Sequence, residues 1–491
     1  MTKSVCSISG AVYNTMRFGI LNSGNDHTGQ AGANSVHILR RIGFYGLLVL
    51  IALAPLPFGS NRPWAWSILS LWVGVLVLLD AVAAGFDPVR GESRFMGRVA
   101  LPFLLFLPVI IWIILQATPD IFTDIAHPIW SEVSAQLGQL LPNYVTISPE
   151  MTWDALMVLL AYAGVFWLAA RHGRDRKNAS MMLKFFVIVS TCYAIYGLVV
   201  FFGGWEKVLW FDKTSYRGDL TSTFVNRNSY ATYAALGLAS SIVVLVNVLE
   251  HDVRKSSTWR EMLRLMTDGV QKKAWLPVVG GLMTGTALML THSRAGFSSG
   301  MLGLFVVLIG LAVSRVLPRK LARRSAGGVV CLLVVGYWFS GDALDQRFEY
   351  AEGDGTIRFA VYEGVMQGIQ LSPATGYGYG TFESGFRQFK PQNVAWATWD
   401  LAHNSYLEFS FDAGLISLIM VLATFIVIFA RNVSGVVSRH RDQIYPILGT
   451  ASALIVAVHS LVDFSVQIPA MGICLMFVLA LGWSQSWPSK G

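Results

Sequence analysis

Apolar runs of about 17–22 residues recur along the chain from Ile42 to Trp483, each bounded by a short polar stretch. A helix of roughly that length crosses a hydrocarbon layer of ~30 Å. The pattern predicts spans at 42–59, 64–84, 99–117, 152–170, 183–203, 228–249, 275–291, 296–314, 326–340, 409–429, 444–462 and 466–483. The ninth is short and has two glycines near its start. We therefore expect an all-α polytopic membrane protein with about 12 transmembrane helices.

The composition agrees with this pattern. Hydrophobic residues make up 54% of the chain and charged residues 13%, and the mean hydropathy is +0.52. An ordinary soluble domain is roughly 25% charged and could not bury so much apolar surface. Three of the four cysteines (Cys192, Cys331 and Cys474) fall in spans and Cys6 lies near the N-terminus, so we expect neither an extracytoplasmic disulfide nor a cysteine metal site.

The basic residues alternate between loops. With the N-terminus inside, 27 of the 37 Lys and Arg residues fall in the tails and inner loops, and 10 fall outside. This asymmetry is the positive-inside pattern, which predicts that both termini are cytoplasmic. The net charge of +8 therefore reflects topology, and we expect no nucleic-acid partner.

This topology divides the chain into four regions. Residues 1–37 lack an apolar core of signal-peptide type, so we expect a disordered cytoplasmic tail. Residues 38–340 carry helices 1–9, residues 341–408 form a large helical periplasmic loop, and residues 409–484 carry helices 10–12. In another outer segment, apolar residues within 129–141 recur at spacings of three and four, which predicts a short helix in the membrane interface. That helix is either passive or a lid or floor over a lipid-facing site.

Two polar motifs lie where outer segments meet spans. Asn226, Arg227 and Asn228 lead into the sixth span, and a helix N-terminus attracts anions because its first backbone N–H groups are unpaired. The alternative is an ordinary Asn cap beside a solvated Arg. Arg294 joins spans seven and eight at the hydrocarbon edge, where a guanidinium needs a partner. A lipid diphosphate head group would serve, and so would lipid phosphates in general.

The large loop carries a helical pattern and a glycine-rich turn. The pattern begins at Arg358, runs through Leu371 and ends before Pro373. The turn at 376–380 alternates glycine and tyrosine but lacks the Lys and Ser/Thr of nucleotide-binding loops. We expect its glycines to let the backbone pack closely, and Tyr377 either to stack on a sugar or to sit in the interface.

His403 lies near the end of this loop, at or just above the outer boundary of the tenth span. A neutral imidazole, whose unperturbed pKa is about 6.5, can accept a proton at neutral pH. Asn404 and Glu408 are four positions apart and are expected to share a neighbouring helix face. The alternative is a histidine that only caps or hydrogen-bonds at the helix start.

Together these motifs resemble the O-antigen ligase and O-antigen polymerase family of bacterial surface-polysaccharide enzymes. The resemblance rests on Phe-x-Asn-x-Asn at 224–228, Ser-Arg-Ala-Gly at 293–296, Arg358 followed by Pro373 and the glycine turn, and His-Asn-Ser-Tyr-Leu-Glu at 403–408. It implies a GT-C-type glycosyltransferase of the bacterial inner membrane that needs no cofactor. Four outer aspartates, Asp212, Asp219, Asp342 and Asp345, leave a divalent ion open.

The family implies metal-independent, inverting glycosyl transfer on the periplasmic face, from an undecaprenyl-diphosphate-linked glycan to an acceptor hydroxyl in O-antigen or exopolysaccharide synthesis. The acceptor is lipid A-core for a ligase and a second lipid-linked glycan for a polymerase, and the sequence favours neither. Carried over by position, Arg294 and Arg358 bind the diphosphate and His403 acts on the acceptor hydroxyl. Arg227 would add a third cation.

A transporter or polysaccharide flippase is the competing class. Transporters of this size often show repeated halves and ionisable residues at mid-span. Here the span interiors are nearly free of charge, no repeat is evident, and polar residues gather in the outer loops. This distribution favours an enzyme.

Overall fold

The computed structural model describes residues 25–86, 92–255, 274–314 and 345–487, together with residues 260, 264, 316, 327 and 328. Long or strongly apolar helices form the bundle: α1 (Asn25–Leu53), α2 (Pro63–Phe86), α3 (Glu92–Gln116), α5 (Pro149–His172), α6 (Arg176–Phe202), α7 (Arg227–Lys255), α9 (Trp275–Leu290), α10 (Arg294–Val313), α15 (Leu415–Ser438), α16 (Ile444–His459) and α17 (Pro469–Gln485).

The connecting segments contain further elements. The helices among them are α4 (Ile129–Leu137), α12 (Asp345–Leu371), α13 (Phe382–Phe386) and α14 (Ser405–Ala413). Single 3-10 turns lie at η1 (Phe58–Ser60), η2 (Thr123–Ile125), η4 (Gln392–Val394) and η5 (Ser465–Gln467). Two short antiparallel strands, β1 (Lys207–Val208) and β2 (Phe211–Asp212), pair Lys207 with Asp212.

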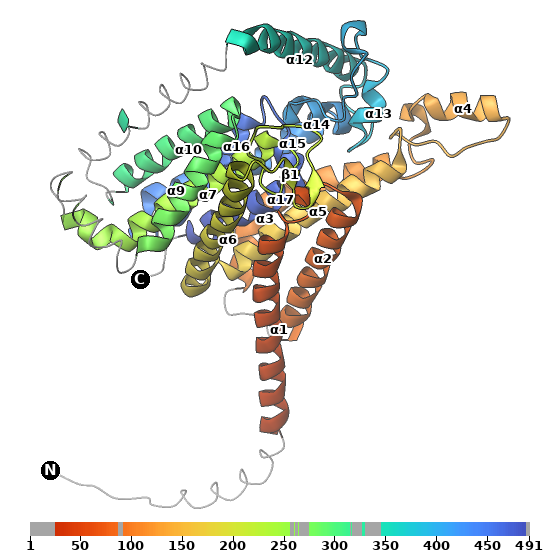
Figure 1. Cartoon of the computed structure of the whole chain (residues 1–491). Coiled ribbons are helices and arrows are strands. Elements are labelled where there is room, and N and C mark those ends of the chain that lie inside the picture. The colour runs from red at the N-terminus through yellow and green to blue at the C-terminus, as the bar shows by residue number, and fades with distance from the viewer. Residues whose placement is uncertain are drawn as a thin grey trace, which may run out of the picture.

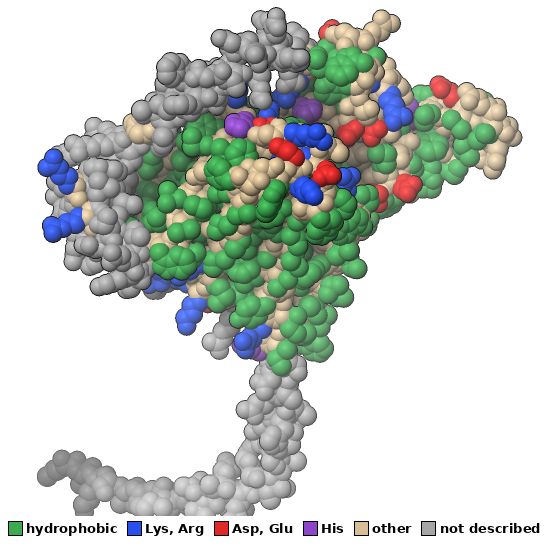
Figure 2. All heavy atoms as spheres, in the orientation of Figure 1, with side chains coloured by type: hydrophobic (Ala, Val, Ile, Leu, Met, Phe, Trp, Pro, Cys, Tyr) green, Lys and Arg blue, Asp and Glu red, His purple; other side chains and the backbone are tan. Residues whose placement is uncertain are grey.

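Within the described residues, eight helices are long and apolar enough to cross a membrane, and α9, α16 and α17 are shorter apolar helices. These helices correspond to the predicted spans except the ninth, at 326–340, which lies outside the described residues apart from residues 327 and 328. Large apolar side chains face outward on them, including Leu71, Leu104 and Ile419, each more than half exposed. In Figure 2, hydrophobic side chains cover much of the visible face of the helices. The chain is therefore a multi-pass membrane protein.

Two predicted boundaries were wrong. The tenth span begins at Leu415, because α14 ends at Ala413 and Gly414 (φ +83°) breaks the helix where an added Cβ would overlap the Ala374 carbonyl. At the other end of the chain, α1 begins at Asn25, so helix covers residues 25–37 that were predicted to be disordered. Extending a helix that is already nucleated needs little intrinsic propensity, which explains the polar extension.

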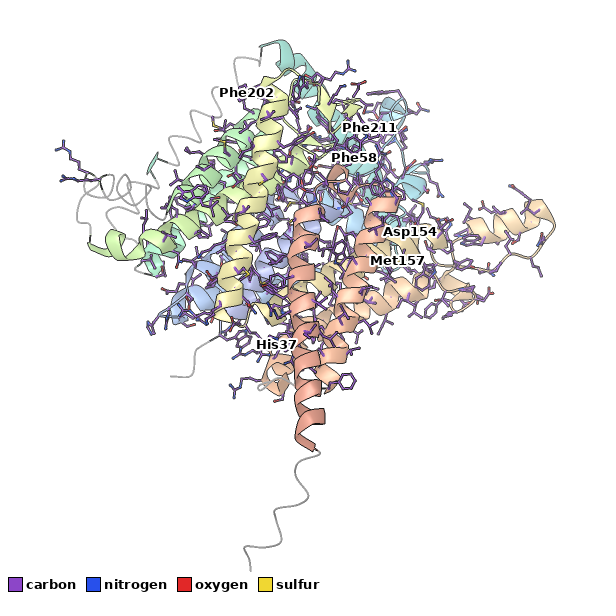
Figure 3. All side chains as sticks on the ribbon, turned by 60° about the horizontal axis from the view of Figure 1, so that its bottom comes forward. His37, Phe58, Asp154, Met157, Phe202 and Phe211 are labelled. Carbon is purple, nitrogen blue, oxygen red and sulfur yellow. The ribbon has the colours of Figure 1, made fainter. Side chains whose placement is uncertain are left out.

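Several of the segments that connect the helices meet at one end of the bundle. The turns after α1, α6 and α16 line one cavity together with α12, α13 and residues 396–403. Figure 3 shows Phe58 and Phe211 together at this end, with ring centroids 5.4 Å apart, and His37 at the opposite end of α1. We call it the loop end. In Figure 1, α12 and α13 lie across it, and α4 extends to one side of the bundle.

The glycine-rich turn confirms the expected close packing. Gly376, Gly378 and Gly380 all have positive φ, and a Cβ on any of them would overlap a neighbour. At Gly378 (φ +111°) the overlap is with Thr146 in the α3–α5 segment. Tyr377 adds backbone hydrogen bonds to Ile147 and Phe411. The turn therefore joins α14 to the segment before α5.

Gly378→Ala should destabilise the protein strongly. The new methyl group both enters Thr146 and holds alanine in the left-handed region, so we expect a loss of more than about 3 kcal/mol of folding stability. The matched control is Gly138→Ala, because Gly138 (φ +62°) has no atom within 4 Å of an added Cβ and should lose only about 1 kcal/mol. Thermal unfolding of the detergent-purified variants measures the difference, and equal melting temperatures would contradict it.

Candidate functional site

A cavity of about 600 Å³ lies at the loop end. His403 and Asn226, two residues selected from different motifs, both line it. Its other walls include Tyr216 before α7, Trp399 in the large loop, and Phe464 between α16 and α17. Polar, aromatic and ionisable side chains therefore converge here from segments far apart in the sequence.

The backbone and ring of His403 are held in place. Its φ is +53°, a left-handed conformation that is uncommon outside glycine. The Tyr362 hydroxyl donates to the His403 carbonyl at 2.9 Å, and the imidazole packs edge-on against Phe464 with ring centroids 4.8 Å apart. Trp399 packs edge-on against the same ring at 5.9 Å. The imidazole is thus oriented by contacts on several sides.

Asn404, and not His403, caps the helix that follows. Its Oδ1 accepts hydrogen bonds from the N–H groups of Tyr406 and Leu407 at 3.0 and 3.1 Å, which is N-cap geometry. Its Nδ2 donates to the Leu461 carbonyl at 3.0 Å. Asn404 therefore caps the helix, the role that was the alternative for His403, and His403 lines the cavity.

Asn226 combines the two interpretations of its motif. Its Oδ1 accepts from the N–H groups of Asn228 and Ser229 at 2.7 and 3.3 Å and so caps α7. Its Nδ2 donates to the Tyr216 hydroxyl at 3.2 Å, at the cavity wall. The cap is ordinary, but it also fixes the start of α7 beside the cavity.

Asp219 links two of the predicted cationic motifs. One carboxylate oxygen accepts from Arg227 at 2.7 Å, and the other lies 2.8 Å from His292 Nδ1. Burial alone would raise the pKa of Asp219, but the contacts with His292 and Arg227 outweigh burial and hold that pKa below its usual range. Arg294, two residues after His292, is exposed and forms no ion pair with any residue the structure describes. The α9–α10 junction and the start of α7 are thus tied to one carboxylate.

Asp463, in the turn between α16 and α17, connects the rest of the site. It is 1% exposed and accepts hydrogen bonds from the Asn228 amide and, at 2.6 Å, from the Phe464 N–H. Burial raises the pKa of Asp463 above its usual range, and these hydrogen bonds and the charges of Arg358 and Arg227 offset only part of that rise. Arg358 also donates to the Val462 carbonyl at 3.2 Å. The sequence motifs did not predict this role for Asp463.

Two residues predicted to support the site lie outside the cavity wall. Tyr377 is 5% exposed, stacks on Phe411 at 4.5 Å and donates to the Gly368 carbonyl, so it belongs to the core of the large loop. Glu408 is buried and accepts from the Ala402 N–H at 2.7 Å. Burial raises the pKa of Glu408 above its usual range. Glu408 braces the backbone just before His403.

Within the described residues, no group of three or more His, Cys, Asp or Glu side chains is arranged to hold a metal ion. Two of the carboxylates at the loop end already have partners, since Asp219 contacts Arg227 and His292, and Asp463 accepts from Asn228. The predicted cationic groups Arg227, Arg294 and Arg358 carry guanidinium groups, which bind phosphate oxygens through planar pairs of N–H donors.

The fold and site define a polytopic helical membrane protein with a cavity lined by His403 at one end of its bundle, and with Arg227 and Arg358 on neighbouring elements. Residues 279–422 match the family model described as O-antigen ligase, and this match supports the O-antigen ligase-like family that the motifs predict. No curated protein matches the chain. The matched region contains Arg294, Arg358 and His403, whereas Asn226 and Asp463 lie on either side of it. The family supports membrane glycosyl transfer of the ligase or polymerase type.

Proposed function

We propose that this protein catalyses inverting, metal-independent glycosyl transfer from an undecaprenyl-diphosphate-linked glycan to an acceptor hydroxyl. The observation that carries the proposal is the placement of His403 in one cavity with Asn226, with Arg227 and Arg358 both close enough to act on Asp463 beside it. A base and several cations are what such a transfer needs, and the family match favours an enzyme over the competing transporter.

In the proposed reaction, the acceptor oxygen forms a bond to the anomeric carbon as the bond from that carbon to the phosphate oxygen breaks. His403 takes the proton of the acceptor hydroxyl. The electron pair of the broken bond leaves on the lipid diphosphate, and Arg358, Arg227 and Arg294 stabilise its growing negative charge. Single displacement inverts the anomeric centre. Asp219 orients Arg227 for this role through their 2.7 Å contact.

A lipid-linked donor also fits an apolar groove beside the site. The groove, about 310 Å³, runs between α15 and α16 from Ser405 and Tyr406 to residues such as Phe425 and Leu454. Ser405 lies two positions after His403 and donates to the Asp463 carbonyl at 3.1 Å. The polyprenyl chain would occupy this groove while its diphosphate reaches the arginines.

The orientation follows from the charges at the far end. Arg98, Arg171, Arg431 and Arg439 lie near the ends of α3, α5 and α15 that are remote from the loop end, and Arg40 lies near the start of the apolar part of α1 (Val36–Leu53). By the positive-inside rule, that end faces the cytoplasm. We propose that the loop end, with the loop at 341–408, is periplasmic, that both termini are cytoplasmic, and that the protein resides in the bacterial inner membrane.

Reconstitution tests the proposal directly. Purified protein in proteoliposomes, given a polyprenyl-diphosphate-linked glycan and either lipid A-core or a second lipid-linked glycan, should form a new glycosidic bond of inverted configuration. Identification of the product's reducing end separates ligase from polymerase. EDTA should leave the rate unchanged, and a loss that Mg²⁺ restores would refute the metal-independent mechanism. Movement of the donor across the bilayer without bond formation would instead support the transporter.

A further inference from the structure

Arginines gather at the end of the bundle opposite the cavity. The guanidinium of Arg98, near the start of α3, lies 4.6 Å from the ring centroid of Trp487, and that of Arg431, near the end of α15, lies 3.9 Å from it. The positive charges of Arg174 and Arg439 also act on Arg98. We call Arg98, Arg431 and Arg439 the arginine cluster.

Within the described part of the chain, carboxylates neutralise this cluster only in part. Of the nearby acids that the structure describes, Asp80 pairs with Arg171 at 2.8 Å, and Asp442 pairs with Arg176 at 2.5 Å and more loosely with Arg439 at 3.7 Å. Repulsion among like charges therefore persists around Arg98.

Some hydrogen-bond donors of the cluster lack an acceptor among the described residues, although others have one. Arg431 and Arg439 donate to the carbonyls of Ser486 and Trp487 at the end of α17. Arg98, although only partly exposed, has no hydrogen bond or ion pair with any residue in the described part of the chain. Nε of Arg431 and Nε1 of Trp487 are buried donors without an acceptor there. Buried donors normally find partners, so an acceptor from outside the protein would complete the cluster.

An apolar groove leads to the cluster. It has a volume of about 160 Å³ and lies among α3, α5, α15 and α17, with Val99, Phe103, Trp167, Phe425, Ile428 and Met476 in its walls. Val99 directly follows Arg98, and Ile428 lies one helical turn before Arg431 on α15. The groove is adjacent to the one beside His403 and shares Phe425 and Ile428 of α15 with it, but its other walls come mainly from α3 and α5.

We propose that this groove and the arginine cluster form a binding site for an anionic phospholipid. The phosphate of the head group accepts from Arg98 and Arg431, and an acyl chain fills the groove between α3 and α15. Basic pockets between membrane helices at one face of the bilayer favour anionic lipid head groups. The bound lipid would join α3 to α15 and to the end of α17. This site does not depend on the proposed glycosyl transfer.

Lipid binding to the full-length purified chain tests the proposal. We expect phosphatidylglycerol to stay bound in native mass spectrometry and to raise the melting temperature by several degrees, whereas phosphatidylethanolamine with the same acyl chains does neither. The double variant R98Q/R431Q should lose at least ten-fold in phosphatidylglycerol affinity. The matched control is R41Q, which removes an exposed arginine of α1 at the same end and should bind like the unaltered protein.

Three results would overturn the proposal. These are equal affinity for the two phospholipids, unchanged binding by R98Q/R431Q, and full stabilisation by inorganic phosphate or by a polyprenyl phosphate in place of phosphatidylglycerol. If R98Q/R431Q proves poorly folded, R98K/R431K decides the matter, because it keeps the charge while losing the planar donor pairs. That variant should bind phosphatidylglycerol more weakly than the unaltered protein but still prefer it to phosphatidylethanolamine, and the absence of that preference would equally overturn the proposal.

Discussion

His403→Gln should reduce glycosyl transfer by about 10²–10⁴-fold, the usual contribution of a general base. Glutamine keeps a polar side chain of similar reach but cannot take the acceptor proton. The loss should appear in kcat, with little change in the donor KM, because His403 is proposed to act on the acceptor hydroxyl. The backbone contact from Tyr362 to the His403 carbonyl does not involve the side chain, so the fold should be retained.

His440→Gln provides the matched control, since His440 is an exposed histidine after α15, remote from the cavity. Its activity should equal that of the unaltered protein at the same expression level. Both variants should be assayed in cells for surface polymer or capped lipid A-core, and in proteoliposomes for single turnover. If His403→Gln retained full activity while being equally abundant, His403 would not be the base.

Arg358→Gln should weaken use of the lipid-diphosphate donor by about 10–100-fold, because one hydrogen bond to a charged group contributes roughly 1.5–3 kcal/mol. Arg227→Gln should have a similar effect, and it also removes the 2.7 Å contact with buried Asp219, which adds a cost in folding stability. Arg294→Gln, at the exposed start of α10, should affect donor use without that cost.

Lys207→Gln is the control for charge removal, because Lys207 lies at the loop end, does not line the cavity, and pairs only with exposed Asp212 at the surface. Rates measured against donor concentration separate donor binding from chemistry, and melting temperatures separate both from folding. Arg358→Lys should recover part of the loss through its retained charge. Unaltered donor dependence in Arg358→Gln and Arg294→Gln would remove their assigned role.

Most of the helices could be predicted because a membrane span needs a long apolar run, and few other structures in this chain have one. The helix break at Gly414 could not, since the apolar residues on both sides continue the same pattern. Its cause is a tertiary contact with the Ala374 carbonyl, which lies 40 positions earlier in the chain. Such breaks depend on packing and leave only a single glycine in the sequence.

The site was predictable only in part. His403 and Asn226 stand in motifs with a distinctive order of residues, and the cavity brings them together. Asp219 and Asp463 lie singly in loops, where the sequence shows neither their burial nor their partners. Charged residues make up only 13% of this chain, and a buried carboxylate is costly without hydrogen bonds. An isolated Asp beside a span is therefore a candidate for a buried position with hydrogen-bond partners. Tyr377 shows the opposite case, because its motif predicted either a sugar contact or a place in the interface, and its side chain lies in the core of the large loop.

The turn between α16 and α17 has a consequence for how this protein can exchange parts with its relatives. Its Asp463 holds Asn228 and Ser405, and its Leu461 carbonyl holds Asn404. Of these, only Asn404 and Ser405 lie within residues 279–422. A recombination event that transferred this segment alone would place His403 among the neighbouring residues of another protein. The product could be active only if residues 226–228 and 461–463 of the recipient made the same contacts. Functional chimeras should therefore be cut so that all three stretches travel together.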